Sequence, residues 1–206
     1  MEISKSTKVF LNAIDGKESA TLISIDINDC KSAIDDKSWE FVQQDSADIL
    51  KLLSSKPKIK NGIDILYIDS LHTAEHVKKE IYNFFEYLNK GAYIFFDDID
   101  SNPYMNKQRK DSVNTEITNR KIFKLLEAIF RSNIDKIDFE IMRGSTGLGI
   151  FKKRKELGEK LNPPIFLNER NNPILSKLFQ KIFLKKTYKH NTKTSSSFLI
   201  NPDKKK

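Results

Sequence analysis

The segment Ile63–Asp98 constrains the fold more than any other part of this 206-residue chain. Its sequence is IDILYIDSLHTAEHVKKEIYNFFEYLNKGAYIFFDD. The nearly continuous apolar run Ile63–Ile68 predicts a short strand that is covered on both faces. Thr73 stands where it can cap a helix, and the apolar residues after it recur at helical spacing. The segment therefore begins as a strand followed by a helix.

A second buried strand is predicted at Ala92–Phe96, after Gly91 interrupts the helical pattern. A strand–helix–strand unit is right-handed and leaves its two strands parallel. If these strands are neighbours, Asp69 and Asp97 leave the sheet at the same carboxyl edge, roughly 5 Å apart. Open α/β sheets bind their ligands at that edge. The acidic residues at the two strand ends therefore predict a functional site.

The segment resembles the middle of a class I S-adenosylmethionine-dependent methyltransferase, in the branch with small-molecule O-methyltransferases and cephalosporin-hydroxylase-like proteins. The matching pieces are TLISIDIND, WEFVQQDSADI, IDILYIDSLHTAEHVKKEI, NKGAYIFFDDI and FEIMRGSTGLGIFKK. They follow the family's order and cover residues 1–153. The resemblance implies a Rossmann-like, doubly wound α/β fold. Its mostly parallel sheet would lie in a three-layer sandwich and end in a C-terminal antiparallel hairpin.

The resemblance also implies S-adenosyl-L-methionine as cofactor. Asp26 would bind the ribose hydroxyls, and Asp45 would approach the adenine amino group beside the backbone of Ser46; Asp69 completes the predicted cofactor site. The family opens with a strand and a glycine-rich loop, whereas here no glycine precedes Gly16. Glycine is normally needed where backbone approaches a ligand closely. We interpret the missing piece as a lost or misassigned start; the alternatives are that the chain is a fragment or that cofactor binding has been lost.

Two catalytic mechanisms are open for the sheet edge. Asp69, Asp97 and Asp98 would repel one another unless a positive group lay among them, and Mg²⁺ or another divalent cation would supply it. The resembling catechol-type enzymes hold a metal with two aspartates and an Asn, and Asp98 stands at the Asn position. The alternative is His72, beside Asp69, whose ordinary pKa near 6.5 suits a general base.

The net charge of +8 is concentrated in the last part of the chain. Residues 151–206 hold fifteen Lys or Arg against four Asp or Glu, so the preceding residues are slightly acidic. Enzymes acting on nucleic acid more often carry positive charge around the catalytic face. This distribution disfavours nucleic acid as a partner.

The domain organisation follows from the change of composition after residue 153. Residues 154–206 are predicted to be a basic extension with an amphipathic helix at about 173–186 and a disordered end. Such a helix can contact an anionic membrane or a protein partner, or it can pack on its own domain. Asp100–Thr118 is predicted to be a long polar loop over the site, and Tyr104 and Arg109 are candidate substrate contacts.

The favoured function is O-methylation of a small molecule or sugar, and the acceptor class comes from the resemblance. A metal-dependent hydroxylase-like or nucleotide-sugar enzyme is a second possibility. The third is a truncated, catalytically inactive scaffold that acts through its basic tail. The lone Cys30 argues against a disulfide framework and favours the cytoplasm. The sequence leaves the oligomeric state open.

Overall fold

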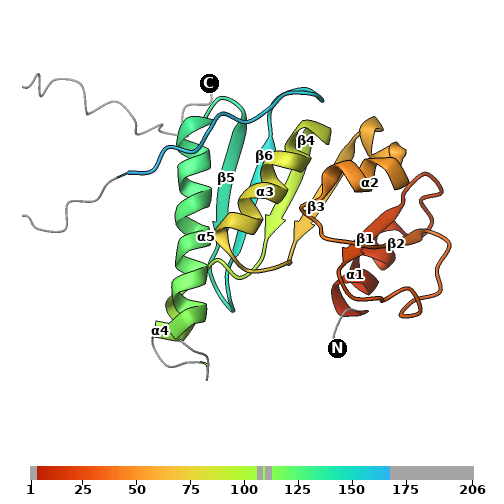
Figure 1. The fold of residues 1–206 in the computed structure, drawn as a ribbon, viewed down its shortest axis with the longest axis horizontal. Helices are drawn as coiled ribbons and strands as arrows, with labels where there is room; N and C mark the ends of the chain where they lie inside the picture. The colour runs from red at the N-terminus through yellow and green to blue at the C-terminus, as the bar shows by residue number, and fades with distance from the viewer. Residues whose placement is uncertain (1–3, 106–108, 110–112, 168–206) are drawn as a thin grey trace, which may run out of the picture. The chain divides into compact units, whose positions relative to one another are not determined.

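The computed structural model describes residues 4–105, 109 and 113–167 (Figure 1). The elements follow in the order α1 (Ser4–Ile14), β1 (Leu22–Asp26), β2 (Trp39–Gln43), α2 (Ile49–Ser55), η1 (Pro57–Asn61), β3 (Ile63–Ile68), α3 (Ala74–Phe84), η2 (Phe85–Tyr87), β4 (Leu88–Phe96), α4 (Asn102–Met105), α5 (Val113–Ser132), β5 (Ile137–Met142) and β6 (Leu148–Lys153). Here η marks a short 3₁₀ helix.

The strands form a parallel pair, β1–β2, and a four-stranded sheet in the order β3–β4–β6–β5. β3 and β4 are parallel, and β6 runs antiparallel to both β4 and β5. These pairings confirm the predicted Rossmann-like α/β sheet with its C-terminal antiparallel hairpin. Among the described residues, β1 pairs only with β2 and β3 pairs only with β4, so each has one edge without a strand partner.

Helices α3 and α5 lie together over one face of the four-stranded sheet (Figure 1). Their apolar residues join those of β4 and β6 in the main core, in which Ile81, Leu126, Ile129 and Phe151 are fully buried. Helix α1 lies on the other side, where Phe10 makes an edge-to-face contact with Tyr67 of β3. Helix α1 therefore supplies the expected third layer, which covers only part of that face.

A second apolar cluster joins the two sheets. It is centred on the buried residues Leu52 and Phe84, from α2 and α3. Ile25 of β1 and Leu66 of β3 both pack against it. The unpaired edges of β1 and β3 therefore belong to strands that share one core layer.

The structure corrects three predictions around β3 and β4. β3 is not covered on both faces, because Ile65 is 53% exposed, and Tyr93, its partner in β4, is 38% exposed. Gly91 does not precede β4 but lies within it, with φ of 85°. The pairing register shifts there, since Ile63 pairs with Leu88 and Ile65 with Tyr93. β4 thus starts four residues earlier than its apolar run indicates.

Most of the described residues in the predicted polar loop at Asp100–Thr118 are helical instead. This segment contains α4, and α5 begins at Val113. The first turns of α5 expose polar side chains and therefore lack the apolar spacing that identifies a helix in a sequence. Helix α2 begins after Asp48, whose side chain caps it by accepting a hydrogen bond from the backbone N–H of Lys51.

Lys153 is a buried lysine inside the domain, with only 1% of its surface exposed. Its Nζ donates hydrogen bonds of 2.9 Å to the backbone oxygens of Phe85 and Leu88. The ammonium group also lies 4.7 Å from the centre of the Phe85 ring. Burial lowers the pKa of Lys153. The side chain closes the end of η2, where helix carbonyls otherwise lack partners.

The compact unit extends to Phe166, beyond the boundary predicted at residue 153. Leu161 is buried in the main core, and the backbone N–H of Asn162 donates to Oδ1 of Asn133 at 2.7 Å. The N–H of Ile165 donates to the carbonyl oxygen of Ala128 in α5. Residues 154–166 therefore hold to the domain. The predicted amphipathic helix and disordered end lie outside the described residues.

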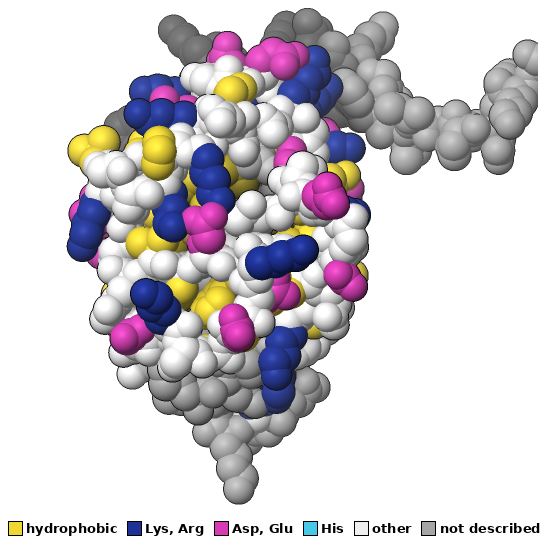
Figure 2. All heavy atoms as spheres, turned by 90° about the vertical axis from the view of Figure 1, so that its right-hand side faces the viewer, with side chains coloured by type: hydrophobic (Ala, Val, Ile, Leu, Met, Phe, Trp, Pro, Cys, Tyr) yellow, Lys and Arg dark blue, Asp and Glu magenta, His cyan; other side chains and the backbone are white. Residues whose placement is uncertain are grey.

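Charges of both signs are mixed over the face formed by α1, β1, β2 and α2, with small apolar areas between them (Figure 2). Leu50 and Ile27 are 77% and 70% exposed. Within the described part of the chain, each helix is too short or too polar to cross a membrane.

Candidate functional site

Four aspartates lie where the parallel strands end. Asp26 is the last residue of β1, and Asp45 follows β2 by two positions. Asp69 directly follows β3, and Asp97 directly follows β4. Backbone hydrogen bonds tie these ends in pairs, from Gln44 N–H to the oxygen of Asp26 and from Asp97 N–H to the oxygen of Ile68. The strand ends that carry Asp26 and Asp45 are therefore adjacent, and so are the strand ends that carry Asp69 and Asp97, as the sequence predicts for the second pair.

His72 lies between two of the predicted site carboxylates. Its Nε2 is 3.4 Å from Oδ1 of Asp69 and 3.5 Å from Oδ2 of Asp98. Asp69 is the main cause that raises the pKa of His72 above 6.5; burial opposes the rise, and Asp98 adds to it. Asp98 reaches this place with a φ of 56°, an uncommon backbone conformation for a residue with a side chain. When it is protonated, the imidazole at this place supplies the positive group that the acidic edge requires.

Both oxygens of Asp97 already accept hydrogen bonds. Oδ2 accepts from the hydroxyl of Tyr67 at 2.7 Å, and Oδ1 accepts from the backbone N–H of Asp98 at 2.8 Å. Thr146 contributes a longer contact of 3.5 Å to Oδ1. Burial, followed by the bond to Asp97, raises the pKa of Tyr67, so its hydroxyl keeps its proton. Asp97 therefore acts as an anchor for the surrounding backbone and side chains.

The predicted metal ligands do not form a ready cation site. Within residues 4–105, 109 and 113–167, no three His, Cys, Asp or Glu side chains are grouped so that they could hold a metal ion. The reason is local, since Asp97 is occupied by its own donors and His72 stands between Asp69 and Asp98. This donor set does not fit a divalent cation in its present arrangement. Metal binding by Asp69, Asp97 and Asp98 stays a prediction.

The predicted cofactor residues Asp26 and Asp45 have partly free carboxylates. Oδ1 of Asp26 accepts from the backbone and side-chain nitrogens of Asn28, at 2.7 and 3.1 Å. Oδ1 of Asp45 accepts from the N–H of Ala47 at 2.8 Å, and the Asp45 side chain is 59% exposed. Each carboxylate also has a second oxygen, which can accept a hydrogen bond from a ligand hydroxyl or amine.

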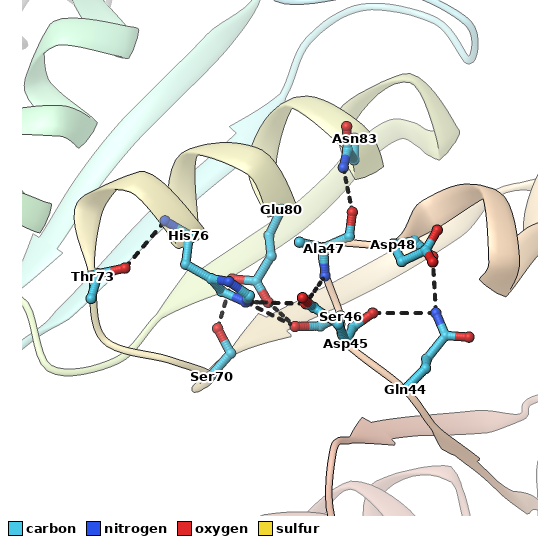
Figure 3. A network of polar contacts seen from close by, with 10 residues as sticks. All are labelled: Gln44, Asp45, Ser46, Ala47, Asp48, Ser70, Thr73, His76, Glu80 and Asn83. Carbon is cyan, nitrogen blue, oxygen red and sulfur yellow. Dashed lines mark hydrogen bonds and ion pairs between the residues drawn. The ribbon is translucent and has the colours of Figure 1, made fainter.

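Ser46 belongs to a buried network of polar contacts that was not predicted from the sequence (Figure 3). Its Oγ donates to Oε1 of Glu80 at 2.6 Å and lies 3.2 Å from Nε2 of His76. Ser70, one residue after Asp69, donates to Oε2 of Glu80 at 2.7 Å. Glu80 is only 3% exposed. The signal was present in the sequence, because Glu80 shares the buried face of α3 with residues three and four positions away.

An open hollow of about 380 Å³ adjoins Asp97 on the side of the β5–β6 turn. Its other lining residues are Met142, Arg143, Gly144, Ser145, Thr146, Gly147 and Leu148. Gly147 has φ of 78°, and a Cβ there would lie 2.6 Å from Cβ of Asp100. The turn therefore needs glycine to approach the segment after β4. Arg109 donates to Oγ of Ser145 at this turn, and Tyr104 lies in α4.

Residues 5–99 match a protein family described as "Methyltransferase domain". The matched segment runs from α1 to just past the end of β4 and holds every predicted catalytic, cofactor-binding and metal-binding residue, whereas Tyr104 and Arg109 lie beyond it. Residues 5–99, just under half of the chain, are therefore similar to a methyltransferase domain. This confirms the resemblance to class I methyltransferases, and the β5–β6 hairpin lies beyond the matched segment.

Individual proteins resemble the chain over limited lengths. "Uncharacterized protein R132" of Acanthamoeba polyphaga mimivirus is 44% identical over 50 residues, which are 24% of this chain and 21% of that protein. The MycE methyltransferase of the mycinamycin biosynthetic pathway, solved with Mg and SAH, is 20% identical, with a TM-score of 0.46 over 66% of this chain and 37% of its own. Podospora anserina methyltransferase PaMTH1, solved with SAH, is 15% identical, with a TM-score of 0.45 over 61% and 53%. The chain thus spans well under two thirds of the length of these proteins.

Proposed function

We propose that the protein transfers a methyl group from S-adenosylmethionine to an oxygen atom of a small molecule or sugar. The observation that carries this proposal is the imidazole of His72 between Asp69 and Asp98, at an acidic sheet edge inside a methyltransferase domain. Open α/β sheets bind ligands at this edge. The donor would lie across the ends of β1, β2 and β3.

Asp26, Asp45 and Ser46 would hold the adenosine part of the donor, with Asp69 facing its methionine end. The exposed carboxylate of Asp45 and the free oxygen of Asp26 suit ligand hydroxyls and amines. Such contacts bring the sulfonium methyl group and the acceptor oxygen together, which supplies most of what a direct displacement requires.

His72 would act as the general base. Its neutral imidazole takes the proton from the acceptor hydroxyl as the oxygen–methyl bond forms and the sulfur–methyl bond breaks. S-adenosylhomocysteine then leaves as the neutral thioether, and the proton remains on His72, where Asp69 and Asp98 stabilise the imidazolium. Asp69 thus serves both the donor site and the base.

The hollow beside Asp97 would receive the acceptor. It adjoins the end of β4, the neighbour of β3, which leads into the loop with His72, and its rim carries hydroxyl groups of Ser145 and Thr146 and the guanidinium of Arg143. Hydroxyl and guanidinium groups form hydrogen bonds with polyhydroxylated or oxygen-rich molecules. This chemistry supports a polar small molecule or a sugar.

Calorimetric titration of the full chain with S-adenosylhomocysteine tests the proposal. We expect saturable binding, weakened in Asp26→Ala by about 1.5–3 kcal/mol, the value of a hydrogen bond to a charged group. Asp29→Ala is the matched control, since Asp29 lies in the same loop and its carboxylate bonds only the local N–H of Lys31. Equal affinity in Asp26→Ala and wild type would remove Asp26 from the site. No binding by the wild type would favour the scaffold alternative.

A further inference from the structure

Glu80 is a buried carboxylate in the middle of α3, and two loops supply its hydrogen-bond donors. Ser46 comes from the loop after β2 and bonds Oε1 at 2.6 Å. Ser70 comes from the loop after β3 and bonds Oε2 at 2.7 Å. A buried charge is costly unless hydrogen bonds compensate it. The two hydroxyls and the carboxylate therefore hold one another in place (Figure 3).

Ser46, His76 and Glu80 do not have the geometry of a nucleophilic Ser–His–Glu triad. In such a triad the carboxylate bonds the imidazole nitrogen that faces away from the serine. Here Oε1 of Glu80 lies 3.6 Å from Nε2 of His76, the same nitrogen that approaches Ser46. The Ser46 hydroxyl donates directly to Glu80. The cluster is therefore built to hold loops together rather than to activate Ser46.

A second bond from α3 reaches the same loop. Nδ2 of Asn83, three residues after Glu80, donates to the backbone oxygen of Ala47 at 2.7 Å. Within the loop, Oδ1 of Asp45 accepts from the backbone N–H of Ala47 and lies 3.8 Å from Nε2 of His76. The segment that carries Asp45 is thus tied to one helix at successive points (Figure 3).

We propose that Glu80 is a positioning residue that fixes the loop after β2 relative to the loop after β3. The first loop carries Asp45, on the adenosine side of the donor site, and the second carries Asp69 and His72, on the reacting side. Glu80 would thereby set the distance between the bound adenosine and the general base without touching either reactant. The effect of Glu80 on the adenosine site and the general base rests on the proposed function. The link between the two loops does not depend on that function.

Amide hydrogen exchange on the ligand-free protein tests the linkage alone. Glu80→Ala should accelerate exchange in both loops, Asp45–Asp48 and Ser70–Thr73, by about tenfold or more, because it removes a charged acceptor from each. Glu80→Gln keeps an acceptor and a donor for the two hydroxyls and should restore near wild-type exchange. Glu75→Ala, which removes an exposed carboxylate from the same helix, is the control. Wild-type exchange of either loop in Glu80→Ala would overturn the linkage.

Two single-bond variants keep the test decisive if Glu80→Ala does not fold. Ser46→Ala and Ser70→Ala each remove one of the two bonds to Glu80. Each should accelerate exchange in the opposite loop as well as in its own. Acceleration confined to the mutated loop would show that Glu80 does not couple them.

Calorimetry with S-adenosylhomocysteine then tests the consequence. Glu80→Ala should weaken binding by roughly 10-fold to 100-fold, and Glu80→Gln should stay within about threefold of wild type. Unchanged binding in Glu80→Ala would overturn the positioning role. If the wild type itself does not bind, the proposed function fails, and the exchange rates still decide whether Glu80 links the loops.

Discussion

Nε2 of His72 lies 3.4 Å from Oδ1 of Asp69, and the two residues sit in one short loop directly after β3. This contact raises the pKa of the imidazole, so the histidine holds its proton to higher pH than a free histidine does. A general base works only in its neutral form. The site therefore stabilises the imidazolium that forms when His72 takes up the proton. It also lowers the fraction of His72 that is neutral near pH 7.

The pH dependence of methyl transfer should report this contact. We expect the rate to rise with pH through a titration above 6.5, as His72 loses its proton. Asp69→Asn should move the rising limb to lower pH, because it removes the main cause of the raised pKa. His72→Gln should lower the rate by roughly 10²–10⁴-fold and abolish the limb. Asp138→Asn, remote on β5, is the control; an unmoved limb in Asp69→Asn would contradict the assignment.

Chelation separates the base mechanism from a metal mechanism. With His72 as base, we expect EDTA to leave the rate of methyl transfer unchanged. Asp97→Asn should then lose less than about tenfold, since an amide can keep the contacts with Tyr67 and with the N–H of Asp98. If EDTA and Asp97→Asn each removed most of the activity, and if Mg²⁺ restored the activity lost to EDTA, the result would instead establish a metal mechanism. Metal binding would then rearrange Asp69, Asp97 and Asp98.

Lys153 should contribute strongly to stability. Lys153→Met leaves the buried oxygens of Phe85 and Leu88 without their donor, at an expected cost of about 1–3 kcal/mol for each unpaired group. Lys152→Met is the matched control, because Lys152 is the neighbour on the opposite, exposed face of β6. Chemical denaturation measures both free energies of unfolding. Equal stabilities of the two variants would show that the Lys153 bonds add little.

Two truncations locate the end of the folded unit. A chain ending at Phe166 should melt cooperatively, near the temperature of the full chain. A chain ending at Arg154 should melt at a clearly lower temperature, because it loses buried Leu161 and the bonds between Asn162 and Asn133. Thermal unfolding followed by circular dichroism compares them. Equal melting temperatures would mean that residues 155–166 do not support the core.

The sequence predicted the parallel unit and its acidic edge because buried strands and capped helices leave strong local patterns. Three such features can be recognised in the sequence alone: the apolar run of β3, the cap at Thr73 and the aspartates at the strand ends. The exposure of Ile65 was not readable, since an apolar run does not say whether a helix covers its far face. The early start of β4 was hidden by a register shift around a polar and glycine-containing stretch.

The candidate site was only partly predictable for a different reason. The spacing of Asp69 and His72 indicated a shared loop. The sequence could not show that Asp97 accepts a hydrogen bond from Tyr67, or that Asp98 lies next to His72. Glu80 was not predicted to be a buried residue of the site, because a charged residue on a helix is usually exposed. Its partners lie 34 and 10 residues away in the chain, beyond the reach of any local pattern.

Amide chemical-shift mapping during titration with S-adenosylhomocysteine tests the central claim most directly. We predict saturable shifts at the ends of β1, β2 and β3, strongest around Asp26, Asp45 and Asp69, with the far ends of the same strands unaffected. Glu75→Ala serves as the control protein, and His72→Gln should retain the pattern, because a general base is not required for binding the product. Absence of shifts at saturating ligand, or shifts confined to another region of the domain, would contradict the assignment of this edge as a methyl-donor site.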